Sequence, residues 1–424
     1  MAFYKGWVNQ FNGYNHNIKL SMAANIITQI GIGIFIVIYN FYVRELGYTE
    51  SVNGKIISMA SLATAIILVP AGIIGDKFGR KRVISTGILV SGTLLIMRAL
   101  AADESTLVYL AFTAGLAGAF LQVSGIPWLA ENSDASQRVN LFSLHFALMT
   151  AASVIGNLLG GILTDFFGLF FSDLQSLRVT LLIGAIIYLG GAIPAFKFRA
   201  PANRMETAPL DGAVRERKAF NWSGFKIIAL FAIAQMLIGF GAGLVIPYLN
   251  LYFAGRFSAS TSTTGFIISL GQAATAFAMI IGPKVVKRVG EVRAVVILQL
   301  LSLPFLLLTA YTQNLWLAAI GFLFRQALMN AGNPIQSSLI MSRVDDSMKG
   351  LANSINQTVF NLGWAFMGPV STGIVVKYGN YWGYAYVFSI TASLYLISSI
   401  YFFLVFGRKV LKNQGKQVPK AAGL

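Results

Sequence analysis

The sequence predicts an all-α polytopic membrane protein, with twelve transmembrane helices in two pseudo-symmetric six-helix bundles. The 424 residues are 56% hydrophobic and only 11% charged, whereas an average soluble protein is about 25% charged. Twelve apolar runs are each long enough to cross a bilayer, which takes about 20 residues, and the two halves of the chain resemble each other. A soluble fold could not bury this much apolar surface.

The apolar runs define the expected spans and the segments between them. We expect the transmembrane helices near residues 20–43, 53–74, 83–101, 105–129, 139–164, 177–196, 224–253, 262–282, 294–312, 315–341, 352–376 and 384–406.

Basic residues predict the orientation of these spans. Of the 32 Lys and Arg residues, 25 fall on the segments that share a side with both termini, and 5 fall on the opposite side. Arg98 and Arg325 lie within helices. Because cations concentrate on the cytoplasmic side, we expect both termini in the cytoplasm and the chain in the cytoplasmic membrane. The same bias explains the net charge of +17 without a nucleic-acid partner.

The segments outside the bundles are polar or amphipathic. Residues 1–19 carry Phe3, Trp7, Phe11 and Tyr14 at helical spacing, which predicts an interfacial helix on the membrane surface. Between the bundles 20–196 and 223–406, residues 197–222 form a charged cytoplasmic linker. Residues 407–424 form a basic tail that we expect against anionic lipid at the cytoplasmic face.

Four blocks of the first half recur in the second. "YNFY" at 39–42 corresponds to "LNLY" at 249–252, with an offset of 210 residues. Three further matches, "GKIISM" with "GFIISL", "DASQR" with "DDSMK" and Ser143 with Ser354, have an offset of 211. A repeat with an even number of helices keeps its orientation, so an axis along the membrane normal would relate the halves around a central cavity.

The most charged short stretch follows the second span and reads "GIIGDKFGRK" from Gly72. It resembles the G-x-x-x-D-[RK]-x-G-[RK]-[RK] loop of the major facilitator superfamily, in the family's position between helices 2 and 3. The resemblance implies a gate that clamps the two halves while the inner side is closed. We expect Gly72 to allow close helix packing and Gly79 a tight turn. The implied gating residues are Gly72, Asp76, Lys77, Gly79, Arg80 and Lys81. The alternative is a loop whose charges only set topology.

Two further motifs resemble elements of this superfamily. Glu131 and Arg138 form an E-x6-R pattern at the inner end of helix 4, similar to the charge network of sugar porters, and are added to the gate. An ordinary solvated pair is the alternative. "GNLLGG" at 156–161 is similar to the G-P-x-x-G-G element of antiporters, with Asn157 in place of proline, and helix packing through small residues explains it equally well.

Polar side chains inside spans are costly and usually face a cavity or another helix. The clearest stripe lies on helix 11, where Asn356, Gln357 and Asn361 share one face that Trp364 extends. The expected substrate-cavity residues are Asn25, Gln29, Gln122, Gln235, Arg325, Gln326, Asn330, Asn333, Asn356, Gln357, Asn361 and Trp364. For each amide, an interhelical hydrogen bond is the alternative role.

Two ionisable groups lie within the spans and have open roles. Arg325 is near the middle of helix 10 with no mid-membrane acid available, so a substrate anion or neighbouring carbonyls and amides could be its partner. His145 is the intramembrane group that could titrate near neutral pH, either as a proton-coupling residue or as a packed neutral side chain.

The resemblance implies an alternating-access secondary transporter that works as a monomer and needs no cofactor. The lack of a mid-membrane acid favours a small neutral or anionic organic solute, with proton coupling left open. A multidrug, amphiphile or lysolipid exporter of the same fold is the alternative, and a non-transporting sensor is a remote one.

The chain has no cysteine and only two histidines, so cysteine nucleophiles and a metal site are not expected, and neither is an enzyme.

Overall fold

The computed structural model describes residues 13–133, 138–199, 222–344 and 348–407. Within these ranges the chain is helical and no strand occurs. The expected surface helix falls mostly on residues 1–12, which lie outside the described part, as do most of the linker and the basic tail.

Helices cover the first six expected spans with small shifts at their ends. They are α2 (His16–Glu45), α3 (Glu50–Phe78), α4 (Arg80–Leu100), α5 (Glu104–Glu131), α6 (Arg138–Phe167), α7 (Asp173–Gly190) and the short α8 (Ala192–Phe196). The polar ends of these helices extend past the apolar runs because each added turn satisfies backbone hydrogen bonds.

The next six spans are more often interrupted. They are α9 (Trp222–Val245), η1 (Ile246–Tyr248), α10 (Leu249–Phe257), α11 (Thr261–Val289), α12 (Glu291–Tyr311), α13 (Leu315–Ala331), α14 (Asn333–Arg343), α15 (Lys349–Phe402) and η3 (Phe403–Gly407). Inside α15, Gly379 has φ 76°, which breaks the 54-residue helix into two.

Nine stretches of the described residues are long and apolar enough to cross a membrane. The stretch Gly350–Gly407 has 58 residues, enough for two crossings at about 20 residues each. The α11 helix and the α13–α14 pair are absent from these nine, although they fill two expected spans. With these included, the described residues account for the twelve expected spans.

Helix boundaries repeat along the chain with the same offset as the sequence blocks. The helices α3 and α11 both have 29 residues, and α4 and α12 both have 21. Their starts are separated by 211 residues in each case. The turns that precede α4 and α12 hold Gly79 and Gly290, with φ of 87° and 81°. The repeat seen in the sequence is therefore also a repeat of local structure.

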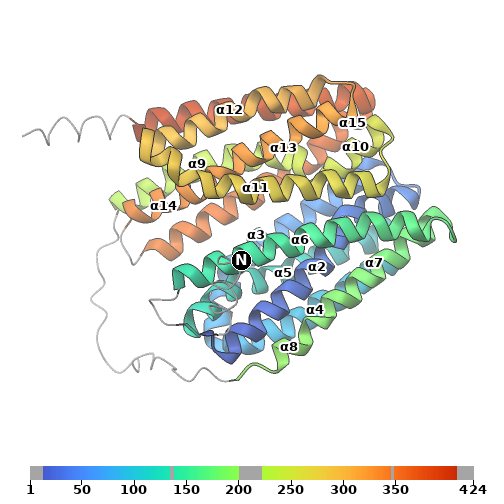
Figure 1. Ribbon diagram of the computed structural model, residues 1–424, viewed down its shortest axis with the longest axis horizontal. Helices are drawn as coiled ribbons and strands as arrows, with labels where there is room; N and C mark the ends of the chain where they lie inside the picture. Colours follow the sequence, from blue (N-terminus) through green and yellow to red (C-terminus); the bar gives the residue numbers. More distant parts are fainter. Residues whose placement is uncertain (1–12, 134–137, 200–221, 345–347, 408–424) are drawn as a thin grey trace, which may run out of the picture. The chain divides into compact units, whose positions relative to one another are not determined.

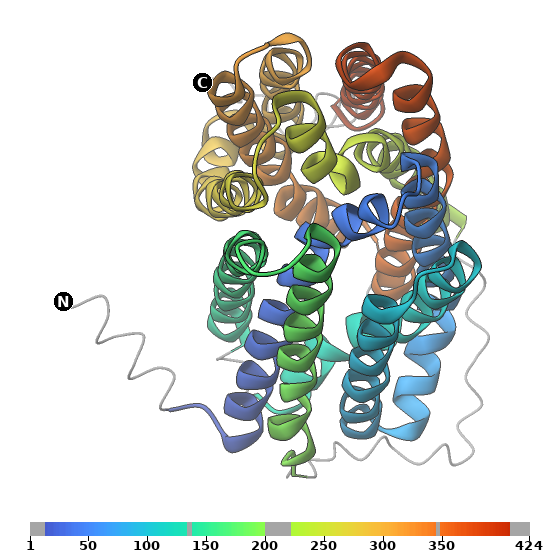
Figure 2. The same cartoon turned by 90° about the vertical axis from the view of Figure 1, so that its right-hand side faces the viewer.

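The chain forms two compact units. The first holds the described residues up to Arg199 and also Tyr248–Ala273, and the second holds the remainder. The sequence repeat places Tyr248–Ala273 in the second half, but this segment packs on α2 and α6 of the first unit. In Figures 1 and 2, α2 lies beside α6 and α7. In the second unit, α9 packs extensively on α15.

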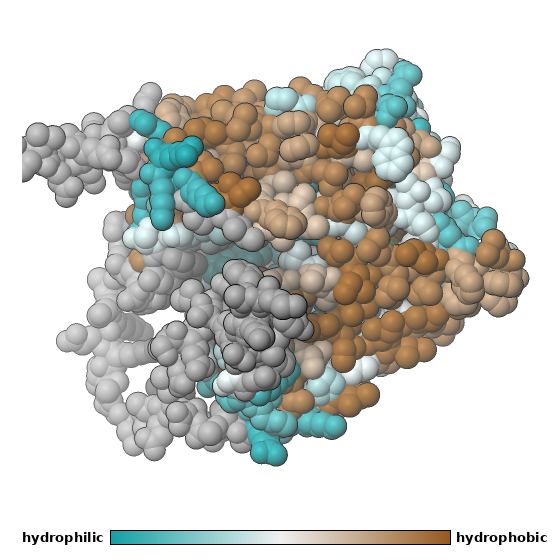
Figure 3. Space-filling view, in the orientation of Figure 1, coloured by the Kyte–Doolittle hydropathy of each residue, from teal (hydrophilic) through white to brown (hydrophobic). Residues whose placement is uncertain are grey.

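Glycines allow the closest helix contacts. A Cβ at Gly33 would lie 3.1 Å from Gly156 Cα, so α2 and α6 meet backbone to backbone. At Gly363 of α15, a Cβ would lie 2.7 Å from Phe240 N of α9. The face shown in Figure 3 is mostly hydrophobic along the helices, with hydrophilic residues near their ends. This is the surface expected of helices in lipid.

Candidate functional site

The charged loop after α3 contacts the end of α5. Gly79 provides the turn, with φ 87°, and the next residue begins α4. Arg80 Nη1 lies 2.9 Å from Glu131 Oε1 at the end of α5. The pair ties the α3–α4 turn to α5 inside the first unit. Both side chains are partly exposed, so we expect the pair to contribute under about 1 kcal/mol to stability.

The other expected gating residues differ in their exposure. Lys77 is exposed and Lys81 is half-buried. The side chains of Asp76 and Arg138 lie outside the described part of the structure. A Cβ at Gly72 would meet no atom within 4 Å, so the expectation that close packing requires glycine there is wrong for this structure.

Next to this loop lies a polar cluster that the sequence did not indicate. Asn17 Nδ2 donates to Asn132 Oδ1 at 2.7 Å and to the Arg199 carbonyl at 3.0 Å. The Arg199 N–H donates back to Asn17 Oδ1 at 2.8 Å, and Asn15 bonds the Asn132 carbonyl. The start of α2, the end of α5 and the chain after α8 are thereby joined. Isolated asparagines carry no sequence pattern that would reveal such a cluster.

The expected cavity residues of the first unit are only partly enclosed. Asn25 and Gln29 on α2 are half-buried, and Gln122 on α5 is exposed. His145 on α6 is buried, and its ring centroid lies 5.6 Å from that of Phe146. This environment matches a packed histidine, whereas its role in proton coupling stays a prediction.

In the second unit, the expected amides on α13 and α14 bond to one another or to nearby amides. Gln235 Nε2 on α9 donates to Gln336 Oε1 at 3.3 Å. Asn330 Nδ2 donates to the Gln326 carbonyl at 3.0 Å, and Asn333 Nδ2 donates to Asn330 Oδ1 at 3.2 Å. These side chains serve at least in part to hold α9, α13 and α14 together.

The amide stripe on α15 retains unused polar atoms. Gln357 is exposed, and Asn361 Nδ2 donates to the Gln357 carbonyl at 2.9 Å. Asn356 Oδ1, Thr358 Oγ1 and Trp364 Nε1 have no hydrogen-bond partner among the described residues. A buried polar atom without a partner is costly, so the atoms of Asn356 and Trp364, which share the stripe, are candidates to bind a substrate.

Arg325 is buried among neutral groups. Its side chain is 2% exposed. Nη1 donates to Gln326 Oε1 and Nη2 donates to Tyr395 Oη, both at 2.8 Å. The guanidinium carbon lies 5.5 Å from the Tyr395 ring centroid. Of the two sequence hypotheses, this geometry favours a structural arginine held by polar neighbours over an arginine that is open to a substrate anion.

The "GNLLGG" element packs α6 against two other helices. A Cβ at Gly160 would lie 2.7 Å from Val37 Cγ1 of α2. A Cβ at Gly161 would lie 2.8 Å from Ser262 Cα of α11, and one at Gly265 would lie 2.6 Å from the Asn157 carbonyl oxygen. Helix packing, one of the two interpretations of this element, is therefore seen directly.

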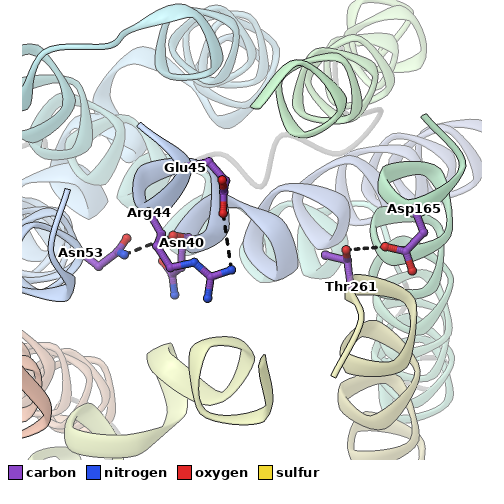
Figure 4. A network of polar contacts seen from close by, with 6 residues as sticks. All are labelled: Asn40, Arg44, Glu45, Asn53, Asp165 and Thr261. Atoms are coloured by element: carbon purple, nitrogen blue, oxygen red, sulfur yellow. Dashed lines mark hydrogen bonds and ion pairs between the residues drawn. The ribbon is translucent and has the colours of Figure 1, made fainter. Parts of the chain in front are cut away.

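A second polar network, at the predicted outer ends of the helices, was also missed. Asn40 Nδ2 on α2 donates to Asn250 Oδ1 on α10 at 3.0 Å, and both side chains are buried. Asn250 Nδ2 donates to the Val37 carbonyl at 2.9 Å, and Asn53 Nδ2 donates to the Asn40 carbonyl at 3.2 Å. Figure 4 shows the Asn53–Asn40 part of this network, with Asp165 and Thr261 in the same view. Asn40 and Asn250 occupy matching positions in the 210-residue repeat. This match was the one feature of the sequence that could have pointed to the network.

The chain matches the Major Facilitator Superfamily over residues 22–233 and again over residues 231–422. It belongs to this superfamily. The two successive matches agree with the internal repeat, and the transporter is accordingly an integral protein of the plasma membrane with small-molecule substrates.

Curated relatives span nearly its whole length. The multidrug resistance protein MdtG of Proteus mirabilis is 26% identical over 416 residues, which cover 93% of this chain and 97% of the relative. The quinolone resistance protein NorA of Staphylococcus aureus is 22% identical over 353 residues, which cover 81% of this chain and 86% of the relative.

Solved structures share the fold. A bacterial homologue of the human lysosomal transporter Spinster, inward-facing and unoccupied, has a TM-score of 0.76 at 14% identity, covering 93% of this chain and 97% of that chain. The nucleoside transporter NupG has a TM-score of 0.74 at 16% identity, covering 92% and 99%. The prediction of a twelve-helix, two-domain fold is confirmed.

Proposed function

We propose that this transporter exports small amphipathic organic molecules that are neutral or anionic. The observation that carries the proposal is the polar stripe of α15, where Asn356 Oδ1 and Trp364 Nε1 have no hydrogen-bond partner among the described residues. An amide and an indole can bond a neutral or anionic solute next to an apolar ring, and neither carries charge.

The charge of the expected cavity supports the same substrate class. Among its twelve residues there is no carboxylate, and the one cation, Arg325, is buried among neutral partners. A site that selects cations in a low-dielectric environment usually pairs them with an acid. The direction of transport is proposed from the relatives, two of which are named resistance proteins.

The remaining expectations form part of the proposal. We place both termini in the cytoplasm, with bundles at 20–196 and 223–406, a linker at 197–222 and a basic tail at 407–424 on anionic lipid. The transporter would act as a monomer and without nucleic acid. The inner gate would comprise the α3–α4 loop with the Arg80–Glu131 pair.

The test is thermal unfolding of the purified protein with neutral, anionic and cationic amphiphiles. A ligand at 100 times its dissociation constant stabilises a protein by about 2.7 kcal/mol, and we expect this for neutral or anionic compounds. Asn356→Ala should weaken binding about threefold to tenfold, because a neutral hydrogen bond contributes about 0.5–1.5 kcal/mol.

Two variants sharpen this test. Ser393→Ala removes a hydroxyl from an exposed site on the second part of α15 and should leave binding unchanged. Asn356→Asp adds a carboxylate to the proposed site and should admit cations. If the parent protein binds cations more tightly than neutral or anionic analogues, the proposed substrate class is wrong.

A further inference from the structure

The first turn of α11 is capped by a side chain from another helix. Thr261 Oγ1 donates to Asp165 Oδ1 at 2.5 Å, and Ser262 N donates to Asp165 Oδ2 at 2.9 Å. Asp165 lies near the end of α6, and Figure 4 shows its carboxylate pointing at Thr261. Helix N-termini favour a carboxylate acceptor, which is normally supplied by the residue before the helix. Here one carboxylate joins two helices.

Below this cap, α6 and α11 are in backbone contact. A Cβ at Gly161 or at Gly265 would lie within 3 Å of backbone atoms on the opposite helix. Ser269 is 2% exposed, and its Oγ donates to the Val154 carbonyl of α6 at 3.0 Å. The contact between α6 and α11 thus extends from the cap for about two turns along α11.

At the predicted outer ends of the helices, the buried Asn40–Asn250 pair joins the neighbouring helix α10 to α2. A cavity of about 420 Å³ beside the cap is lined by charged groups from three elements, namely Arg44, Glu45, Asp165 and Asp173, and by Thr261. The carboxylate of Asp165 can therefore be hydrated when the cap opens, which lowers the cost of breaking it.

We propose that Asp165 is the outer latch of the transport cycle: its carboxylate holds α11 on α6 in the outer-closed state and releases it when the outer side opens. The proposal rests on the proposed alternating-access function, in which α10 and α11 move with the second half of the chain. Tyr248–Ala273 groups with the first unit although the repeat assigns it to the second half. Asp165 is a positioning residue, because no substrate contact is assigned to it.

Asp103 provides a matched control carboxylate. It caps its own helix, α5, by accepting from Thr106 N at 2.8 Å. The backbone hydrogen bond from Thr106 holds the pKa of Asp103 below its ordinary value. Removing it deletes a cap without releasing one helix from another.

The experiment uses the absence of cysteine from the chain. Ser269→Cys places one thiol in the contact between α6 and α11, and a membrane-impermeant maleimide reports its accessibility in right-side-out vesicles. We expect slow labelling in this background and labelling at least tenfold faster with Asp165→Ala added. Asp165→Asn retains an acceptor oxygen and should lie between the two, and Asp103→Ala should match the background.

A merely structural role would lower the thermal midpoint without changing outer accessibility. The proposal is overturned if Asp165→Ala labels at the background rate, if Asp103→Ala accelerates labelling equally, or if the increase appears only in inverted vesicles. Thr264→Cys, at a fully buried position nearer the cap, repeats the test should Ser269→Cys not fold. Because labelling needs no substrate, its failure is distinct from failure of the proposed substrate class.

Discussion

Arg325 shows how a cation is held within a span when no acid is present. Its guanidinium donates to one amide and one phenol and lies over the ring of Tyr395. Tyr395 itself packs on Gly241, where a Cβ would lie 2.6 Å from the tyrosine ring. The arginine therefore links α13 to the second part of α15 and indirectly to α9.

Replacing Arg325 should affect stability more than substrate choice. Arg325→Ala would leave a cavity and unpaired Gln326 and Tyr395 groups, so we expect a loss of about 2–4 kcal/mol in the free energy of unfolding. Thermal unfolding measures this, and Arg293→Ala, which removes an exposed cation from α12, should cost under about 0.5 kcal/mol. A stable Arg325→Ala variant that no longer binds anions would instead place Arg325 in the substrate site.

Sequence patterns placed Arg80 and Glu131 in two charged motifs on the same side of the membrane. Their ion pair was not predicted, because the loop motif implied a clamp between the two halves and the E-x6-R pattern paired Glu131 with Arg138. Tyr395 could not be foreseen as the partner of Arg325, because 70 residues separate them and a tyrosine in an apolar helix is unremarkable in sequence. Asp165 looked like an ordinary acid at a helix end, since its role depends on α11 arriving beside it.

At the scale of elements, the glycines of the charged loop have different roles. Gly79 and Gly290, its repeat partner, combine φ of 87° and 81° with extended ψ of 126° and 161°, a conformation that costs other residues about 1–3 kcal/mol. Gly72 has helical geometry and open space around it.

Alanine substitutions should separate these roles. Gly79→Ala and Gly290→Ala should each destabilise the protein by about 1–3 kcal/mol, measured as a lower midpoint of thermal unfolding. Gly72→Ala should be neutral or stabilise by up to about 1 kcal/mol, because alanine favours helix over glycine. An equal loss at all three positions would contradict the turn assignment.

The expected cavity also divides by element. Sequence periodicity grouped the amides of α13, α14 and α15 as one class, because each set lies on one helix face. The structure separates them: several on α13 and α14 bond to each other, whereas Asn356 and Trp364 on α15 keep unused atoms. Periodicity identifies a polar face, but only packing decides which face is satisfied by neighbouring helices.

For the whole molecule, hydropathy and the repeat predicted the fold class and nearly every helix. Short interruptions were missed, such as η1 after α9, where Pro247 lies within Ile246–Tyr248 and cannot donate a backbone hydrogen bond. The grouping of Tyr248–Ala273 with the first unit was also missed. A sequence repeat reflects chain ancestry and local structure, whereas this grouping depends on which contacts form in one conformational state.

The repeat is symmetric in its helices but not in its charges. Arg80 and Glu131 correspond to Glu291 and Ser342 at the 211-residue offset, so the second half cannot form the equivalent ion pair. Asp76 corresponds to Lys287. If the charged loop is an inner gate, its Arg80–Glu131 pair has no counterpart at the matching positions of the second repeat.

The central claim is that this chain moves a neutral or anionic amphiphile across the membrane, and flux into proteoliposomes tests it most directly. The test compound is the one that best stabilises the purified protein. Proteoliposomes would be filled with this compound in unlabelled form, and a radiolabelled form of the same compound would be added outside. We predict protein-dependent tracer accumulation by exchange, reduced by Asn356→Ala and absent from protein-free liposomes. Tight binding without any flux, in vesicles where the protein is folded, would contradict transport and favour the sensor alternative.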